Sequence, residues 1–324
     1  MSQLRDSHGR EKHKLRLSLT DRCNFRCRYC MPDKPTWLPR DELLSDGELL
    51  RLTRLFVQQG ITQLRLTGGE PLLRPQLEQL VARLSTLRAD GLQRISLTTN
   101  GALLADRAQA LVDAGVDDIN ISLDALDADI FRRLTRAELA PVLAGIEAAS
   151  ATGVPVKINT VLVRGYNESQ VLPLLHWAMD RQLPLRFIEY MPLDQPGRWQ
   201  RDSVLDEAEV LRLIRQQHRV DKIVRASDPA SPYLVDGVFP LGIISTVSHP
   251  FCASCDRLRL TARGDLYTCL FAADGRPLGT PMRQGASDAD LQQLISQAVW
   301  HKQAGYGATP GPVERAVKMY GMGG

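Results

Sequence analysis

With 324 residues, of which 44% are hydrophobic and 24% charged, the chain can bury a large core and has the composition of an ordinary globular protein. Its formal net charge of +3 and aromatic content of 6% do not indicate a nucleic-acid-binding protein, which would need basic and aromatic residues interleaved on one face. No apolar run approaches the roughly 18 residues of a membrane-spanning helix, and residues 1–14 lack the apolar core of a signal peptide. We therefore expect a cytoplasmic protein that binds neither nucleic acid nor membranes.

Strand-like and helix-like segments alternate from residue 14 to about residue 190. Alternation of apolar residues predicts strands at 15–20, 63–67, 94–98, 118–122, 156–163 and 185–189. Helical periodicity predicts helices at 45–59, where Ser45 is a good N-cap, and at 76–87, 107–114, 141–152 and 169–181. Such alternation predicts an α/β fold with a parallel sheet of right-handed βα units. About six units are fewer than a closed TIM barrel needs, so we predict an open, partial TIM-like barrel rather than a doubly wound sheet.

The regular alternation of strand-like and helix-like segments ends after Pro192. Residues 194–202 are polar with Pro and Gly, as in a linker, and a helix at 203–218 and short strands follow. A strand-like run covers 264–270, a last amphipathic helix covers 287–300, and the tail from residue 305 is rich in Gly and Pro. We therefore predict a barrel domain over residues 1–193 and a C-terminal α+β domain over residues 194–324.

The cysteines form two groups of three, and none is left over. In a chain without an export signal, such groups indicate metal rather than disulfides. The first group, Cys23, Cys27 and Cys30, follows the first predicted strand with C-x3-C-x2-C spacing. Three thiolates on one loop can hold three irons of a 4Fe–4S cluster and leave the fourth iron open to a ligand. Zinc would prefer four ligands, and neither a His nor a fourth Cys lies near Cys23 in the sequence.

Polar or glycine-rich loops also follow the other predicted strands. They include residues 68–71 after the second strand, 99–101 after the third, 122–124 at the end of the fourth and 189–192 at the end of the sixth. Functional groups of α/β barrels and open α/β sheets collect at the carboxyl ends of the strands. The agreement of these loops predicts a single site at that end of the sheet.

The second cysteine group consists of Cys252, Cys255 and Cys269. One alternative is zinc, because His249 would complete a Cys3His set. The other is a second cluster with an open iron, favoured by the Arg257-Leu258-Arg259 run that follows, which places two arginines on one face of a strand. The spacing of the cysteines alone does not distinguish zinc from a second cluster.

Several basic residues interrupt apolar strands. Arg16 lies between two leucines, as does Arg65, so each points to the opposite face, which is the inside of a barrel. A buried cation needs an anionic partner, and a triphosphate is one. Lys157 lies between Val156 and Ile158 in the same way, although an ion pair to a strand carboxylate is an alternative for it.

The motifs together resemble those of a known family. An aromatic residue before the third cysteine and a GGE sequence after the second strand resemble the radical S-adenosylmethionine (SAM) superfamily. Nearly the whole chain, through LRLTGGEPLLR, TTNG, NISLDAL, LRFIEYMP, FCASCDRLRLTARGDLYTCLF and a terminal Gly-Gly, resembles the GTP 3′,8-cyclase family. By this resemblance the SAM-binding residues are Tyr29, Gly69, Glu70, Ser122 and Met191. The GTP-binding residues are Arg16, Arg65, Thr98, Lys157, Arg257, Leu258 and Arg259.

The resemblance also implies a mechanism and partners. Two 4Fe–4S clusters are implied, one on each cysteine group, with Cys23, Cys27, Cys30, Arg257 and Arg259 as catalytic residues. A lyase is implied that converts GTP to (8S)-3′,8-cyclo-7,8-dihydroguanosine 5′-triphosphate in the first step of molybdenum cofactor biosynthesis. The resemblance further implies a homodimer and an unidentified electron donor. It also implies that cyclic pyranopterin monophosphate synthase is the next enzyme and that the glycine tail enters the active site. The alternative is a radical SAM enzyme with an auxiliary cluster that modifies a peptide or another substrate.

Overall fold

The fold is built on one curved, open sheet. The computed structural model describes residues 3–193, 199–224, 228–305 and 317–323. Twelve strands of these residues form the sheet, in the order β12-β11-β10-β1-β2-β3-β4-β5-β6-β9-β8-β7. Its central strands run parallel to one another: β1 (Lys14–Ser18), β2 (Gln63–Thr67), β3 (Arg94–Thr99), β4 (Asp118–Ser122), β5 (Val156–Leu162) and β6 (Leu185–Glu189). The predicted parallel sheet of six units is confirmed, and the end strands β12 and β7 do not pair, so the barrel is open.

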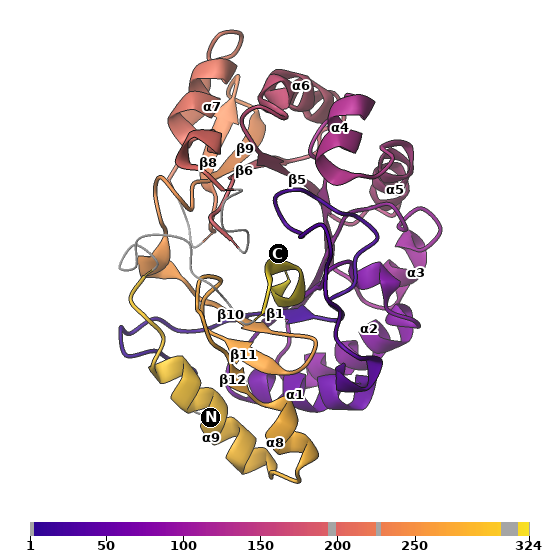
Figure 1. The fold of residues 1–324 in the computed structure, drawn as a ribbon, viewed down its shortest axis with the longest axis vertical. Helices are drawn as coiled ribbons and strands as arrows, with labels where there is room; N and C mark the ends of the chain where they lie inside the picture. Colours follow the sequence, from indigo (N-terminus) through magenta and orange to yellow (C-terminus); the bar gives the residue numbers. More distant parts are fainter. Residues whose placement is uncertain (1–2, 194–198, 225–227, 306–316, 324) are drawn as a thin grey trace.

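Helices cover the outer side of the central strands, as Figure 1 shows. They are α1 (Asp46–Gln58), α2 (Leu77–Ser85), α3 (Ala108–Asp113), α4 (Ala128–Thr135), α5 (Ala140–Ala151) and α6 (Val171–Asp180). Ser45 caps α1 as predicted, because its side chain accepts the Glu48 N–H while the Glu48 carboxylate accepts the Ser45 N–H. The prediction missed α4, a short helix that Asp127 caps. It also extended α2 and α6 over neighbouring 3-10 turns, at Thr86–Asp90 and Glu168–Gln170.

The alternation of side chains along β1 and β2 separates the core from the inside of the barrel. Leu15 and Leu17 are fully buried on the helix-covered face, and the same holds for Leu66 of β2. The residues between them face the opposite side, and the register pairs Arg16 with Arg65 across the two strands. The predicted inward arginines therefore stand side by side.

The second half of the chain extends this sheet at both edges. On one side, β10 (Arg257–Leu260) pairs in parallel with β1 and is followed by β11 (Asp265–Tyr267) and β12 (Arg276–Pro277). On the other side, β9 (Phe239–Ile244) pairs in parallel with β6 and is followed by β8 (Ser231–Val235) and β7 (Val220–Lys222). The domain division at residue 193 stays a prediction, and one sheet runs through both parts.

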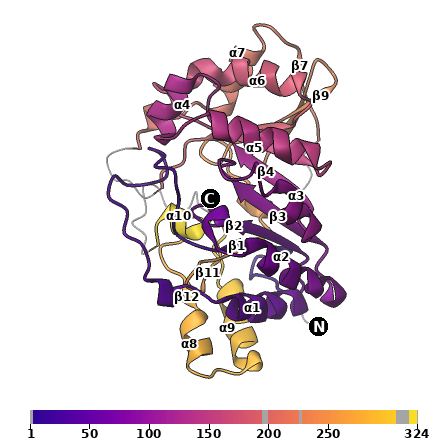
Figure 2. The same ribbon diagram turned by 90° about the vertical axis from the view of Figure 1, so that its right-hand side faces the viewer.

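The remaining helices lie at the two ends of the molecule and inside it. They are α7 (Glu207–Ile214), α8 (Gly279–Arg283), α9 (Asp288–Trp300) and α10 (Met319–Met322). Helix α7 is shorter than the predicted 203–218 because Asp206 caps it, and the strand predicted at 264–270 ends at Tyr267. Figure 2 shows α8 and α9 beyond α1 at one end, α6 and α7 at the other, and α10 between them. Most of the predicted linker at 194–202 lies outside the described residues.

No helix within the described ranges has the length and apolarity that crossing a bilayer would require.

Candidate active site

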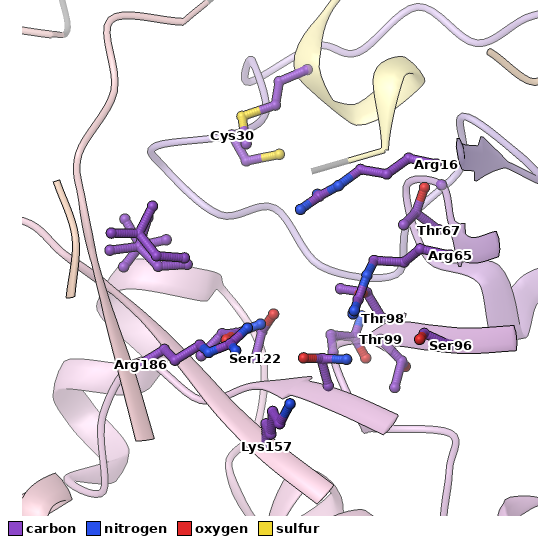
Figure 3. Close-up of a pocket in the computed structure, with 18 of the residues that line it drawn as sticks. Arg16, Cys30, Arg65, Thr67, Ser96, Thr98, Thr99, Ser122, Lys157 and Arg186 are labelled. Atoms are coloured by element: carbon purple, nitrogen blue, oxygen red, sulfur yellow. The ribbon is translucent and has the colours of Figure 1, made fainter. Parts of the chain in front are cut away.

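A cavity of about 520 Å³ lies on the inner side of the sheet (Figure 3). Among the described residues that line it, seven are cationic and three are acidic, so it favours an anionic ligand. Many predicted site residues come together there: Arg16, Cys23, Cys27, Tyr29, Cys30, Arg65, Gly69, Thr98, Ser122, Lys157, Met191 and Arg257. The strand ends and the cysteine loop therefore form one site, as predicted.

The first cysteine group lies on a loop that is tied to the end of α4. Arg26 and Arg28 donate their backbone N–H groups to the carbonyl oxygens of Thr135 and Leu134, at 3.0 and 2.9 Å. None of the three sulfurs belongs to a disulfide in the described structure. Burial raises the pKa of Cys23 to about 11 and the pKa of Cys27 well above its ordinary value. Thiolates are the ligand form, so loading this loop with metal must release protons.

The cysteines fit a cluster better than a single metal ion. In the part of the chain that the structure describes, no three His, Cys, Asp or Glu side chains converge on one metal-ion position. His249, which would have completed a zinc site, instead places Nδ1 3.1 Å from the Ser248 hydroxyl and 3.8 Å from the Glu207 carboxylate. A 4Fe–4S cluster takes each cysteine on a different iron, so its thiolates need not converge on one point.

Tyr29 and Gly69 fix the loops at the cysteine end of the cavity. The Tyr29 hydroxyl donates to the Asp124 carboxylate at 2.8 Å, which joins the cysteine loop to the end of β4. A Cβ atom on Gly69 would stand 2.3 Å from the carbonyl oxygen of Arg22, so only glycine allows the two loops to approach so closely. Ser122 and Met191 line the same cavity from the ends of β4 and β6.

Glu70 points into the protein rather than into the cavity. Its carboxylate accepts hydrogen bonds from the Thr99 hydroxyl and the Asn100 N–H at 2.7 Å each, and from the Leu72 N–H at 3.0 Å. Burial outweighs these hydrogen bonds and raises its pKa to about 7. Glu70 therefore joins the ends of β2 and β3, and its contact with SAM stays a prediction.

A row of three arginines crosses strands β10, β1 and β2. The register places Arg16 between Arg259 and Arg65. Burial, and then the charges of these two neighbours, lower the pKa of Arg16 well below its ordinary value. Three guanidinium groups held together in this way indicate a site for a polyanion such as a triphosphate.

Lys157 and Arg186 face this row from β5 and β6 (Figure 3). Lys157 forms no ion pair among the described residues, which disfavours the structural alternative for it. Arg186 was missed, although it alternates with buried Leu185 and Phe187 just as Arg16 alternates with leucines. Its guanidinium lies 2.7 Å from the Asp228 carboxylate.

Asn159 is a second residue that the sequence prediction missed. It lines the cavity beside Ser122, its partner in the β4–β5 register. Its side-chain oxygen is buried and accepts no hydrogen bond from any residue in the described ranges. A buried acceptor without a donor is costly, so this oxygen indicates a ligand that brings one.

The C-terminal tail enters the cavity and contacts the arginine row. Met319 and Tyr320 line the cavity, and Arg259 donates to the carbonyl oxygen of Gly323. Gly323 has φ +70°, and a Cβ atom there would stand 1.9 Å from the Thr67 hydroxyl oxygen. The implied entry of the tail is therefore seen as far as Gly323, while Gly324 lies outside the described residues.

The second cysteine group is connected to the cavity by Arg257. This guanidinium lines the cavity, lies 3.7 Å from the Cys255 sulfur and stacks over the ring of Phe251. Burial would raise the pKa of the Cys255 thiol, but the charges of Arg257 and Lys302 outweigh it and lower the pKa to about 6. Leu258 is fully buried in the core, so its side chain is remote from any ligand in the cavity.

Comparison with known proteins agrees with this site. Residues 17–178 match the Radical SAM superfamily, and residues 183–308 match Molybdenum Cofactor Synthesis C. The curved sheet resembles that of SuiB from Streptococcus suis, with a TM-score of 0.60 at 15% identity over 93% of this chain and 68% of that one. This likeness concerns the fold alone. The fold and the cysteine loop define the chain as a radical SAM enzyme.

Relatives of known activity indicate which radical SAM enzyme family the chain belongs to. GTP 3′,8-cyclase of Corynebacterium glutamicum is 45% identical over 93% of this chain and 84% of its own length. GTP 3′,8-cyclase of Streptomyces coelicolor is 43% identical over 93% of this chain and 90% of its own. The chain belongs to the GTP 3′,8-cyclase family. It converts GTP to the 3′,8-cyclised nucleotide in the first step of molybdenum cofactor biosynthesis, as a radical SAM enzyme with SAM and an iron–sulfur cluster as cofactors.

Proposed function

We propose that the two cysteine groups divide the reaction, with the radical formed at the first and the guanine held at the second. The observation that carries this proposal is the parallel pairing of β1 with β10. The first group follows the end of β1, whereas Cys255 lies two residues before the first residue of β10, so the groups lie toward opposite ends of neighbouring strands. At about 3.3 Å per residue, the strand between them spans roughly 13 Å, which suits a nucleotide.

The first group, Cys23, Cys27 and Cys30, would hold the cluster that binds SAM. With both bound, this end of the cavity supplies a 5′-deoxyadenosyl radical. Ser122, Met191 and the Tyr29 loop would position the SAM nucleoside. Asn159 would accept a hydrogen bond from a hydroxyl or amino group of that nucleoside through its buried oxygen.

The cation row would hold the triphosphate of GTP between the two groups. Arg16, Arg65 and Arg259 present guanidinium groups from adjacent strands, and Lys157 and Arg186 face them. Thr98 accepts a hydrogen bond from Arg65 at 3.2 Å and would orient that guanidinium. Fixing the ribose near the radical source and C3′ near C8 of the guanine is the contribution that this site makes to the rate.

The second group, Cys252, Cys255 and Cys269, would hold the other cluster, with the guanine beside it. Arg257 and Arg259 start from this side, so they are candidates to deliver the proton that completes the product. Leu258 would contribute only backbone groups, because its side chain is buried.

We also propose a cytoplasmic homodimer that takes electrons from a separate donor and passes its product to cyclic pyranopterin monophosphate synthase. The activity of the family and the oxygen sensitivity of exposed clusters support this proposal. Sedimentation of the anaerobic holoenzyme at the mass of a monomer would contradict the dimer.

Metal content tests the division of the site. Anaerobically reconstituted protein is expected to carry about eight irons per chain, in two clusters of four. Four irons and one zinc would contradict the second cluster. Cys27→Ala should abolish both 5′-deoxyadenosine formation and cyclisation, whereas Cys255→Ala should abolish cyclisation alone. Equal losses in the two variants would contradict the division of roles, and stimulation by ATP equal to that by GTP would contradict the substrate assignment.

A further inference from the structure

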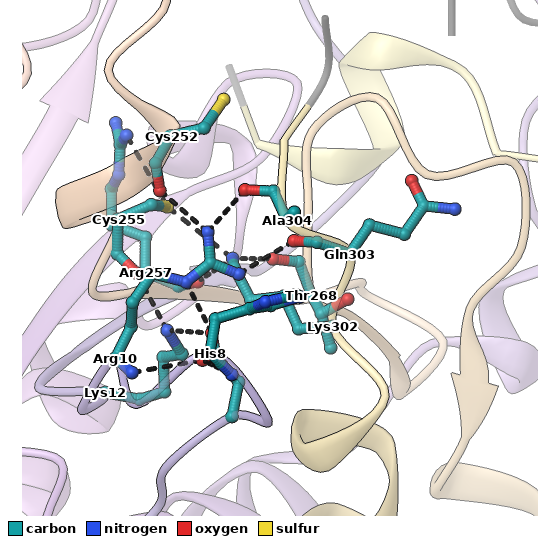
Figure 4. A network of polar contacts seen from close by, with 11 residues as sticks. His8, Arg10, Lys12, Cys252, Cys255, Arg257, Thr268, Lys302, Gln303 and Ala304 are labelled. Carbon is teal, nitrogen blue, oxygen red and sulfur yellow. Dashed lines mark hydrogen bonds and ion pairs between the residues drawn. The ribbon is translucent and has the colours of Figure 1, made fainter. Parts of the chain in front are cut away.

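A buried polar network lies behind the second cysteine group, outside the cavity (Figure 4). Part of it comes from residues 4–12, which fold back on themselves through a bridge between Arg5 and Glu11 and a hydrogen bond from the Lys12 N–H to the Leu4 carbonyl. We call these residues the N-terminal hairpin. The rest comes from the segment that follows α9, which includes Lys302.

Asp6 and Arg10 attach the hairpin to the cysteine loop. The Asp6 carboxylate binds Arg10 Nε at 2.7 Å and Lys12 Nζ at 2.8 Å. The Arg10 guanidinium in turn donates to the carbonyl oxygens of Cys252, Ala304 and Gln303, at 2.7, 2.6 and 2.7 Å. A single, mostly enclosed arginine therefore ties the hairpin to both the cysteine loop and the segment after α9.

Two buried lysines contact Cys255 itself. Lys12 donates to the Cys255 carbonyl oxygen at 2.8 Å. Lys302, only 3% exposed, donates to the carbonyl oxygens of Arg257 and Thr268, and its Nζ lies 3.5 Å from the Cys255 sulfur. Lys302 thus reaches this sulfur from behind, while Arg257 reaches it from the cavity.

The charges of this network do not balance without a further anion. It holds three cations, Arg10, Lys12 and Lys302, and one carboxylate, Asp6, which pairs with the first two. Lys302 forms no ion pair with a carboxylate in the described part of the chain. A buried ammonium without a compensating anion is unfavourable, so negative charge on the cysteine side would stabilise the network. A cluster held by three thiolates supplies such charge and becomes more negative on reduction.

We propose that Lys302 is a positioning residue that stabilises the reduced state of the second cluster through its hydrogen bond to the Cys255 sulfur. The proposal rests on the proposed function, which assigns that cluster to Cys252, Cys255 and Cys269. Hydrogen bonds and positive charge at the sulfurs raise the reduction potential of a cluster.

The hydrogen-bond donors to the first cysteine group differ in charge from those to the second. The Cys23 sulfur accepts from the Phe25 N–H at 3.4 Å and from the Asn100 amide at 3.8 Å, and both donors are neutral. The Cys255 sulfur receives an ammonium and a guanidinium instead. Neutral donors stabilise added negative charge less than cationic ones do. We therefore expect the second cluster to be reduced at a higher potential than the first.

The test is a redox titration of the full-length chain, reconstituted anaerobically and followed by electron paramagnetic resonance. Lys302→Met removes the ammonium and keeps much of the side-chain length. Lys34→Met makes the same change at an exposed lysine and serves as the matched control. Each change is also made in a Cys27→Ala background, in which the second cluster is titrated alone.

Lys302→Met is expected to lower the midpoint potential of the second cluster and to leave that of the first unchanged, while Lys34→Met moves neither. If Lys302→Met does not fold, Lys302→Gln keeps a donor for the carbonyl oxygens without the charge, and the same decrease is expected. An unchanged potential in a protein with about eight irons would overturn the role of Lys302 and leave the cluster assignment intact. A wild-type protein with about four irons would overturn the assignment and, with it, the role of Lys302.

Discussion

Substitution of Gly323 by alanine is expected to release the C-terminal tail from the cavity. Gly323 has a left-handed φ of +70°, which costs a residue with a Cβ about 1 kcal/mol. The new Cβ would also stand 1.9 Å from the Thr67 hydroxyl oxygen, and overpacking of this kind costs about 1–3 kcal/mol. The two costs together are about 2–4 kcal/mol, or roughly a 30- to 700-fold shift in the docking equilibrium.

The tail should undock rather than strain the sheet, because it is a short terminal segment whereas Thr67 belongs to the paired strand β2. Among the described contacts are the hydrogen bond from Arg259 to the Gly323 carbonyl and that from the Tyr320 hydroxyl to the Thr36 carbonyl, at 3.1 Å for the latter. Undocking is measured by hydrogen exchange of the C-terminal peptide, since the Gly321 N–H is bonded to the Lys318 carbonyl in the docked state. Exchange should accelerate by the factor given above, and cyclisation should fall while the rest of the protein keeps its protection.

A compensating change separates the two causes. Thr67→Ala removes the hydroxyl that the new Cβ would overlap, and it loses only the hydrogen bond from that hydroxyl to the Leu17 carbonyl at 3.3 Å. Combined with Gly323→Ala, it should restore docking in part, because the Thr67 Cβ would still lie 2.9 Å away and the cost of the left-handed φ remains. Wild-type exchange of the tail in Gly323→Ala, or no recovery in the double variant, would refute this reasoning.

Three further predictions concern single residues in the cavity wall or directly next to it. The folded chain keeps the Glu70 proton up to about pH 7, whereas the unfolded chain releases it near pH 4.5, so unfolding stability should fall by about 3 kcal/mol as the pH rises between these values. Glu70→Gln should remove this fall in urea titrations of the apo-protein. An equal dependence of the unfolding free energy on pH in the wild type and in Glu70→Gln would contradict this prediction. Asn159→Ala should weaken SAM binding about fivefold in calorimetry without loss of apo-protein stability, because its oxygen accepts no hydrogen bond from the described residues. Lys157→Met should weaken GTP binding about tenfold or more but leave guanosine binding unchanged, and a parallel loss for guanosine would place Lys157 elsewhere than at the phosphates.

The sheet of the first half could be predicted because each βα unit is a local pattern. Apolar alternation marks each strand, and helical periodicity marks most of the helices between them. The position of β10 beside β1 could not be predicted, because no local pattern states which strand a distant segment will join. The same holds for the N-terminal hairpin: the sequence around Arg10 and Lys12 is that of an ordinary polar terminus, and only the fold places these two residues against Cys252 and Cys255.

The site shows a similar division. Arg16 and Arg65 were predicted because a cation between two leucines must face the inside of a barrel, and that rule also applies to Arg186, where it was not used. The carboxylate of Glu70 could not be placed from the sequence, since a residue after a tight turn can point either to a ligand or to the next loop. In the structure this carboxylate accepts hydrogen bonds from the Thr99 hydroxyl and the Asn100 N–H at the end of β3.

The buried Leu258 explains how the two ends of the site are held in register. It alternates with Arg257 and Arg259 on β10, and its burial with Leu260 fixes which face of the strand turns inward. A slip of one residue would turn both arginines into the core and both leucines into the cavity, at a large cost in free energy. Because Cys255 lies only two residues before this strand, the same register that aligns Arg259 with Arg16 also sets how far the second cysteine group lies from the arginine row. A side chain that is buried away from the cavity thereby determines the distance over which a bound nucleotide must reach.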